Sequence, residues 1–293
     1  MKNILISGSN GFLGSYLVKH FLEKNYTVIG LKRKNSNDIR ISLLKNKNFV
    51  LYNIDEIDMQ SIFHNHRIDV VINTVCCYGR NNESKKILEE GNFNFPKELF
   101  EHSNNNFVKL FINTDTLLPE KTNDYSFIKS KFRKFLKSSI HVTKKINLRI
   151  EHMYGPYDDE NKFIYWLINK LIYSSENVKL TSGIQLRDFI FIVDVVSAYE
   201  HAIICSDDFI ENYNEYDLIS GKLTSVKEFV KILLQKLSLF KNIDYEKRIL
   251  FGKLNYREND VMKPMLNQNS FINTHWKPKF SVNDGLEQIV NKL

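Results

Sequence analysis

Short apolar runs alternate with segments of helical periodicity along the first half of the chain. Apolar and β-branched runs predict strands at Ile4–Ser7, Thr27–Leu31, Asn48–Tyr52, Val70–Val75, Val108–Asn113 and Lys145–Ile150. Apolar residues at helical spacing predict helices at Phe12–Lys24, Ile57–His66, Lys85–His102 and Tyr125–Lys137. This strict alternation favours an α/β fold with a doubly wound parallel sheet, because right-handed crossovers place helices on both faces.

The pattern becomes less regular after residue 150. Helices are predicted at Phe163–Tyr173, Val226–Leu237 and Val282–Lys292, the second of them opened by the capping-box spacing of Ser225 and Glu228. No internal repeat and no Pro/Ser-rich linker separates this part from the first. We therefore expect one domain over residues 1–150 and a smaller, interleaved C-terminal lobe over residues 151–293.

Composition and charge narrow the function classes. With 293 residues, of which 43% are hydrophobic and 26% charged, the chain is typical of globular proteins. No apolar stretch approaches the ~18 residues that cross a bilayer, and the first apolar run is too short for a secretory signal, so we expect a cytoplasmic protein with no membrane partner. The net charge of +7 is spread along the chain, which favours an anionic small molecule over nucleic acid. The three cysteines have no CxxC or Cys/His spacing, so we expect no metal site.

A glycine-rich loop joins the first predicted strand to the first predicted helix. Its spacing is G-x-x-G-x-x-G, and a helix that opens on such a loop offers N–H groups to an anion. Gly8 permits a tight turn, Gly11 lets the backbone approach a pyrophosphate, and Gly14 permits close packing of helix on strand. A structural turn is the alternative reading. We predict that the loop binds a dinucleotide through Gly8, Asn10, Gly11, Phe12, Leu13 and Gly14.

The end of the second predicted strand indicates which dinucleotide fits. Sites for NAD usually carry an acidic residue there to bind the ribose hydroxyls, whereas this chain has Lys32 and Arg33. An acid would repel a 2′-phosphate, and these two cations would pair with it. The sequence therefore favours NADP(H) as the cofactor, against the alternative of a solvated basic turn.

Tyr125 and Lys129 are four residues apart on a predicted helix, so they share one helix face. A free phenol has a pKa of about 10, too high for acid–base chemistry at neutral pH. An ammonium ~6 Å away contributes roughly 2.8 kcal/mol at an effective dielectric of ~20, which would lower that pKa to ~8. We therefore predict Tyr125 as a general acid or base and Lys129 as its partner and a ribose ligand. Thr114, which follows the strand Val108–Asn113, is placed to donate a hydrogen bond to a substrate carbonyl.

Taken in order, these features resemble the extended short-chain dehydrogenases/reductases, and more narrowly the NAD(P)-dependent epimerase/dehydratase group that acts on nucleotide sugars. The resemblance covers essentially the full length. Besides the glycine loop, Thr114, Tyr125 and Lys129, it rests on Asp69–Asn73, Asn92–Asn94, Leu148–Arg149, Met153–Pro156, Gln185–Phe189, Trp276–Pro278 and Gly285–Leu286. It implies a Rossmann-type NADP-binding domain over residues 1–150 and a substrate-binding lobe over residues 151–293.

The resemblance also implies roles for single residues. Thr114, Tyr125 and Lys129 fall on the family's catalytic triad, and Asn92 falls where the family has an asparagine on the nicotinamide side. The remaining candidates are substrate ligands: Arg187, helped by Lys162, for the diphosphate, and Tyr78 and Arg80 for the sugar pocket. The family often forms dimers through the tyrosine-bearing helix, and we expect a homodimer here, with Phe132, Phe135 and Leu136 available for that interface or for the core.

Departures from the family pattern point to one reaction. Dehydratases of this group follow the threonine with Asp-Glu, whereas here Asp115 is followed by Thr116, which disfavours dehydration. The short gap between Thr114 and Tyr125 is similar to that of 4-keto-6-deoxyhexose reductases, which make sugars of the CDP-abequose, CDP-paratose or dTDP-fucose type. We therefore predict an NADPH-dependent reductase of a CDP-, dTDP- or GDP-linked 4-ketosugar. The alternatives are an epimerase with tightly bound NAD(P) and a non-catalytic NADP-binding protein.

Overall fold

The computed structural model describes residues 2–266 and 269–293, which form two compact units. The first unit contains the chain up to Ile150 together with Val196–Asp217 and Asn269. The second contains Glu151–Val195, Leu218–Leu266 and Ser270–Leu293. The hydrophobic pattern did not predict that Val196–Asp217 belongs to the first unit. In the described part of the chain, no helix combines the length and apolarity that crossing a membrane requires.

The first unit is built on a seven-stranded sheet with the order β10-β6-β5-β4-β1-β2-β3. The pairs β1–β2, β1–β4, β2–β3, β4–β5 and β5–β6 are parallel. The prediction of a doubly wound parallel sheet is therefore confirmed. The strands are β1 Asn3–Ser7, β2 Thr27–Lys32, β3 Phe49–Asn53, β4 Val70–Asn73, β5 Leu110–Thr116, β6 Lys144–Ile150 and β10 Tyr213–Leu218.

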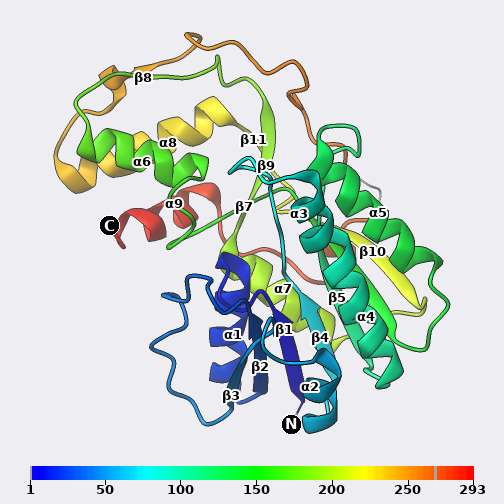
Figure 1. The fold of residues 1–293 in the computed structure, drawn as a ribbon. Coiled ribbons are helices and arrows are strands. Elements are labelled where there is room, and N and C mark those ends of the chain that lie inside the picture. The colour runs from blue at the N-terminus through cyan, green and yellow to red at the C-terminus, as the bar shows by residue number, and fades with distance from the viewer. Residues whose placement is uncertain (1, 267–268) are drawn as a thin grey trace. The chain divides into compact units, whose positions relative to one another are not determined.

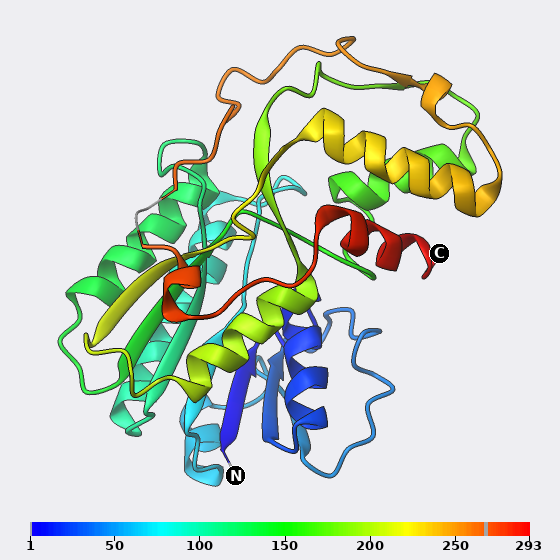
Figure 2. The same ribbon diagram turned by 180° about the vertical axis from the view of Figure 1, so that it is seen from behind.

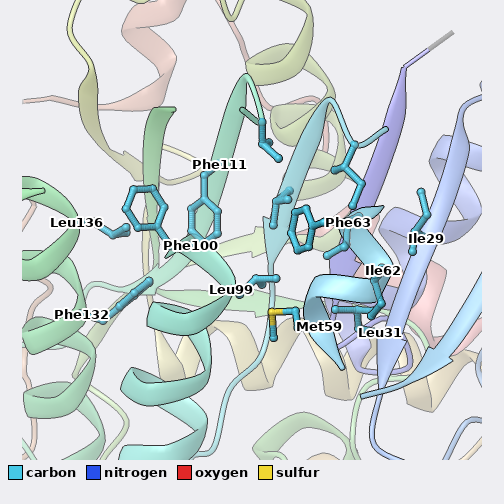
Figure 3. Close-up of a cluster of buried hydrophobic side chains, with 14 residues drawn as sticks. Ile29, Leu31, Met59, Ile62, Phe63, Leu99, Phe100, Phe111, Phe132 and Leu136 are labelled. Carbon is cyan, nitrogen blue, oxygen red and sulfur yellow. The ribbon is translucent and has the colours of Figure 1, made fainter. Parts of the chain in front are cut away.

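Helices cover both faces of this sheet (Figure 1). Side chains of α2, α4 and α5 pack with strand residues such as Leu5, Val71 and Phe111 in one buried cluster (Figure 3). On the other face, α1 and α7 lie side by side (Figure 2), and His20 of α1 is 2.9 Å from Glu200 of α7. The helices are α1 Phe12–Glu23, α2 Met59–Asn65, α4 Phe95–Asn105, α5 Asp124–Ser138 and α7 Ile192–Ile204.

Two elements of the first unit differ from their predictions. The helix expected at Lys85–His102 is three segments: α3 Lys85–Glu89, a π-helical turn Glu90–Asn94 and α4. Pro96 at the start of α4 has no N–H to continue an α-helical ladder, which accounts for the break. Strand β5 runs to Thr116 instead of Asn113, because Thr114–Thr116 pair with the last residues of β6.

The described residues of the second unit form smaller sheets and three longer helices. Strands β7 His152–Tyr154, β9 Leu186–Phe191 and β11 Leu223–Ser225 form one sheet, and β8 Val178–Lys179 pairs with β12 Ile249–Leu250. The helices are α6 Phe163–Tyr173, as predicted, α8 Val226–Lys241 and α9 Val282–Val290. Ser225 caps α8 by accepting a 3.1 Å hydrogen bond from the Glu228 N–H, as its sequence spacing predicts. Short 3₁₀ turns lie at Glu246–Arg248 and Phe271–Thr274.

Candidate active site

The glycine loop has the backbone geometry of an anion cradle. Gly8 has a φ of +69°, a conformation that side-chain-bearing residues rarely adopt. The Gly11 N–H donates a 2.9 Å hydrogen bond to the Gly8 carbonyl. A Cβ at Gly14 would lie only 2.1 Å from that carbonyl oxygen, so α1 can pack this closely only on a glycine. Because the N-cap residue Gly11 has no side chain, no side-chain cap satisfies the first amides of α1, and they suit an anionic group.

The other loop residues support the cradle in different ways. Phe12 and Leu13 are buried, so their side chains anchor α1 while their backbone remains at the helix start. The Asn10 amide donates hydrogen bonds to the Ser36 hydroxyl at 2.9 Å and to the Asn37 carbonyl at 2.6 Å. The loop is thereby tied to the segment after β2. A Cβ-free turn followed by uncapped helix amides fits the pyrophosphate of a dinucleotide.

Lys32 and Arg33 lie at the carboxyl end of β2, where the Ser9 N–H also bonds to the Leu31 carbonyl at 3.1 Å. The Lys32 side chain is only 8% exposed, and its amine lies 3.6 Å from the Asp38 carboxylate. It also donates to the carbonyls of Arg33 and Lys34 at 3.4 and 3.3 Å. Lys32 therefore braces its own turn, whereas Arg33 is exposed.

Helix α5 carries Tyr125 and Lys129 on one face. Asn123 and Ser126 form a capping box at its start, which fixes the first turn where Tyr125 lies. The Lys129 side chain is buried, and its ammonium donates a 2.8 Å hydrogen bond to the Thr114 carbonyl. The lysine thus attaches the tyrosine-bearing helix directly to strand β5.

Burial decides the proton affinity of Tyr125. The phenol is 8% exposed, and burial raises its pKa well above 10; the neighbouring Cys76 thiol, which contacts the phenol by a hydrogen bond, and Tyr78 raise it further. The prediction of a pKa near 8 is therefore wrong for the protein by itself. That prediction considered the ammonium of Lys129 and omitted desolvation, which disfavours the phenolate.

The sequence pattern places Thr114 after the end of its strand. In the structure Thr114 lies within β5, because the strand continues to Thr116. Its hydroxyl is 2.7 Å from the hydroxyl of Tyr199, a fully buried residue of α7. Sequence reasoning missed Tyr199, since its helix lies where the pattern becomes irregular. The Tyr199 contact fixes the rotamer of Thr114 and orients its hydroxyl.

The loop after β4 brings Tyr78 to Tyr125 and Arg80 onto the ring of Tyr78. The rings of Tyr78 and Tyr125 have centroids 5.3 Å apart, and the Arg80 guanidinium lies 4.6 Å above the Tyr78 ring. Asn92, fully buried in the π-helical turn, accepts from the Cys77 N–H at 3.1 Å and donates to the Cys77 carbonyl at 2.8 Å. Both ends of the Asn92 amide thus hold the loop that carries Tyr78.

Arg187 and Lys162 belong to the second unit. The Arg187 guanidinium donates to the Val261 carbonyl at 2.5 Å and to Asp260 at 3.3 Å, and lies 3.8 Å from Glu151. The Lys162 ammonium donates to Asp158 at 2.6 Å. Both predicted diphosphate ligands therefore have carboxylate partners within their own unit.

A family model described as the NAD dependent epimerase/dehydratase family matches residues 4–214. The chain belongs to this family. It is accordingly an enzyme of the extended short-chain dehydrogenase/reductase type, as the sequence resemblance predicted.

Relatives of this epimerase/dehydratase chain carry several names. It is 28% identical to the CDP-abequose synthase of Salmonella typhimurium over 305 residues, which cover 99% of this chain and 98% of that protein. It is 23% identical to a putative UDP-glucose 4-epimerase of Methanocaldococcus jannaschii, with 98% and 97% covered. Among solved structures, the UDP-glucose 4-epimerase of Thermotoga maritima superposes with a TM-score of 0.82 at 23% identity, covering 99% and 98% of the two chains. The dTDP-glucose 4,6-dehydratase of Bacillus anthracis gives 0.80 at 17%, covering 100% and 96%. These two structures confirm the Rossmann-type fold.

Replacing Asn92 by Ala should lower the free energy of unfolding by about 1–3 kcal/mol, because both polar groups of Cys77 lose a buried partner. Urea denaturation measures the change. The matched control is Asn94→Ala in the same turn: Asn94 is exposed and bonds only to Glu90 at 3.0 Å among the contacts described, so about 0.5 kcal/mol or less is expected. Equal losses for the two variants would contradict the anchoring role of Asn92.

Proposed function

We propose that the protein is an NADPH-dependent reductase that delivers a hydride to the C4 keto group of a nucleotide-linked 4-keto-6-deoxyhexose. The observation that carries this proposal is the buried phenol of Tyr125 on a helix that Lys129 attaches to the strand of Thr114. A phenol carries its proton at neutral pH and can give it to an alkoxide, which is a much stronger base. Reduction of a ketone needs such a donor.

Separate groups of residues would bind the cofactor and transfer the proton. A bound NADPH would supply the hydride. The amides at Gly11–Gly14 would bind its pyrophosphate, with Asn10 supporting the loop, and Lys32 and Arg33 would face a 2′-phosphate. Tyr125 protonates the forming C4 alkoxide, while the Thr114 hydroxyl, oriented by Tyr199, holds that oxygen.

For the substrate, we propose Tyr78 and Arg80 as sugar-pocket residues, because the Tyr78 ring lies against Tyr125 and the Arg80 guanidinium stacks on the Tyr78 ring. Arg187 and Lys162 are proposed diphosphate ligands, which requires them to exchange carboxylate partners such as Asp260 for phosphate oxygens. Relatives named CDP-abequose synthase support a CDP-linked sugar, although dTDP- and GDP-linked sugars share the same diphosphate chemistry.

An epimerase with tightly bound NAD(P) is the second candidate, favoured by the relative and the solved structure named UDP-glucose 4-epimerase. Such an enzyme must also take a proton from a sugar hydroxyl, which requires the phenolate of Tyr125, the charged form that burial disfavours. The homodimer and the cytoplasmic location stay predictions. For a dimer through α5, Phe132 and Leu136 are fully buried in the core of their own chain, whereas Phe127 is 41% exposed.

We predict that the purified protein consumes one NADPH for each 4-keto-6-deoxyhexose supplied as its CDP, dTDP or GDP derivative. Absorbance at the reduced nicotinamide band follows the reaction, and NMR identifies the product. A UDP-hexose control without a keto group should consume none. Interconversion of UDP-hexoses without added cofactor, together with no NADPH consumption, would replace the reductase by the epimerase.

Replacing Tyr125 by Phe removes the proton donor and should lower kcat by about 100-fold or more. Binding of NADPH, followed by its fluorescence, should survive because the glycine loop is untouched. Tyr173→Phe is the matched control, since that hydroxyl belongs to a residue that is 83% exposed, and its kcat should be unchanged. Wild-type kcat in Tyr125→Phe would exclude this phenol as the donor.

The double change Lys32→Asp and Arg33→Ala should shift the preference from NADPH toward NADH, because an acid repels the 2′-phosphate. Comparing kcat/KM for the two cofactors measures this shift. Lys34→Ala serves as the control: Lys34 is exposed and pairs with Glu56, so the NADPH preference should persist. A wild-type protein that already prefers NADH would contradict the assignment of NADPH.

A further inference from the structure

A row of buried polar side chains crosses the centre of the sheet. Ser7, Asn73, Asn113 and Asn147 occupy matched register positions on β1, β4, β5 and β6. None of the four is more than 1% exposed. Buried amides of this kind are tolerated only when their hydrogen-bonding groups find partners, since unpaired ones are costly.

The row is a continuous chain of hydrogen bonds with one direction. The Ser7 hydroxyl donates to Asn73 Oδ1 at 2.8 Å, and Asn73 Nδ2 donates to Asn113 Oδ1 at 2.9 Å. Asn113 Nδ2 then donates to Asn147 Oδ1 at 2.7 Å. Each asparagine thus accepts from one neighbour and donates to the next, so removing one member leaves groups unpaired on both sides. The row of hydrogen bonds begins at Ser7, the residue before Gly8 of the glycine loop.

The row ends on a cluster of charged side chains, one of which, Arg133, belongs to helix α5. Asn147 Nδ2 donates to Asp115 Oδ2 at 2.9 Å and to Glu215 Oε2 at 3.1 Å. Arg133 donates to the same Asp115 oxygen at 2.5 Å and to the Thr116 carbonyl at 3.1 Å. The side chain of Asp115 is fully buried, so Arg133 compensates a carboxylate that would otherwise be costly in the core.

Arg133 lies on the catalytic face of α5. Tyr125, Lys129 and Arg133 follow one another at four-residue spacing, so their side chains form a stripe along the helix. Lys129 bonds to the Thr114 carbonyl, and Arg133 bonds to Asp115, the next residue of β5. Two successive turns of α5 are therefore attached to two successive residues of the strand that carries the Thr114 hydroxyl. The Asp115 carboxylate forms an ion pair with Arg133 and so holds α5 against β5.

We propose that the row Ser7–Asn73–Asn113–Asn147, closed by Asp115 and Arg133, is a positioning device that fixes the Tyr125 face of α5 relative to the glycine loop. Its effect on turnover rests on the proposed reductase function. The row connects the loop that would bind the dinucleotide to the helix that bears the proton donor through side chains alone. Arg133 acts through Tyr125 and Lys129 and is a positioning residue, not a catalytic one.

The test compares Arg133→Met with a matched control, Arg149→Met. Arg149 pairs with Asp217 at 2.5 Å; the two side chains are 13% and 0% exposed, close to the 19% and 0% of Arg133 and Asp115. The control pair connects β6 to β10. Arg149 also lies 4.0 Å from Glu215 of β10, but neither Asp217 nor Glu215 is on α5. Loss of either arginine removes a cation that pairs with a buried carboxylate, so the two variants should lose similar stability, measured by Tm.

Only Arg133→Met should disturb the chemistry. We expect its kcat to fall about 10-fold or more while KM for NADPH changes by less than about 3-fold, since misplacement of a reacting group lowers the chemical step. The isotope effect on kcat with NADPH deuterated at the transferred position should rise, because chemistry becomes more rate-limiting. Arg133→Lys, which keeps the cation, should recover part of kcat and serves as the variant if Arg133→Met does not fold. Arg149→Met should keep kcat within about 3-fold.

Equal losses of kcat in Arg133→Met and Arg149→Met, with an unchanged isotope effect, would overturn the positioning role. Hydrogen–deuterium exchange separates this outcome from failure of the proposed function. If the wild-type protein reduces no 4-ketosugar, the reductase proposal fails. The rate of hydrogen–deuterium exchange at residues 124–131 then tests by itself whether Arg133 fixes the start of α5. Faster exchange there in Arg133→Met than in Arg149→Met supports the device, and equal exchange overturns it.

Discussion

The hydrogen bond from the Lys129 ammonium to the Thr114 carbonyl is the contact on which the site depends. A buried ammonium is stable only with such a partner, and here the partner belongs to the strand that carries the Thr114 hydroxyl. Helix α5 therefore cannot slide along β5 without leaving a buried charge unpaired. This bond, together with those of Arg133 to Asp115 and Thr116, fixes the position of Tyr125, one turn before Lys129, relative to Thr114.

The burial of Tyr125 determines which protonation state of its phenol is favoured. Burial raises the pKa of the Tyr125 phenol well above its usual value, because desolvation disfavours the charged phenolate. The Thr114 hydroxyl, which Tyr199 orients, belongs to the strand to which the tyrosine-bearing helix is attached. This arrangement is the geometric basis of the reductase activity that we propose.

Sequence reasoning predicted the fold and named candidate site residues from local signals. The glycine spacing, the strand–helix alternation and the Tyr125–Lys129 spacing are properties of short segments, and the sheet they predict is confirmed. The direction of the Tyr125 pKa could not be predicted, because burial depends on packing from distant segments such as the loop of Cys76. Tyr199 was missed for the same reason, since α7 returns to the first unit from beyond residue 150. The carboxylate partners of Arg187 and Lys162 are likewise products of tertiary structure.

The most direct measurement is a crystal structure of the protein with NADP⁺ and the nucleotide-linked product sugar. We predict the Tyr125 phenol oxygen within about 3 Å of the C4 oxygen of the sugar, a normal hydrogen-bond distance, with Lys129 still bonded to the Thr114 carbonyl. A sugar whose C4 oxygen is bonded to another side chain, with the Tyr125 hydroxyl directed away from it, would contradict the central claim.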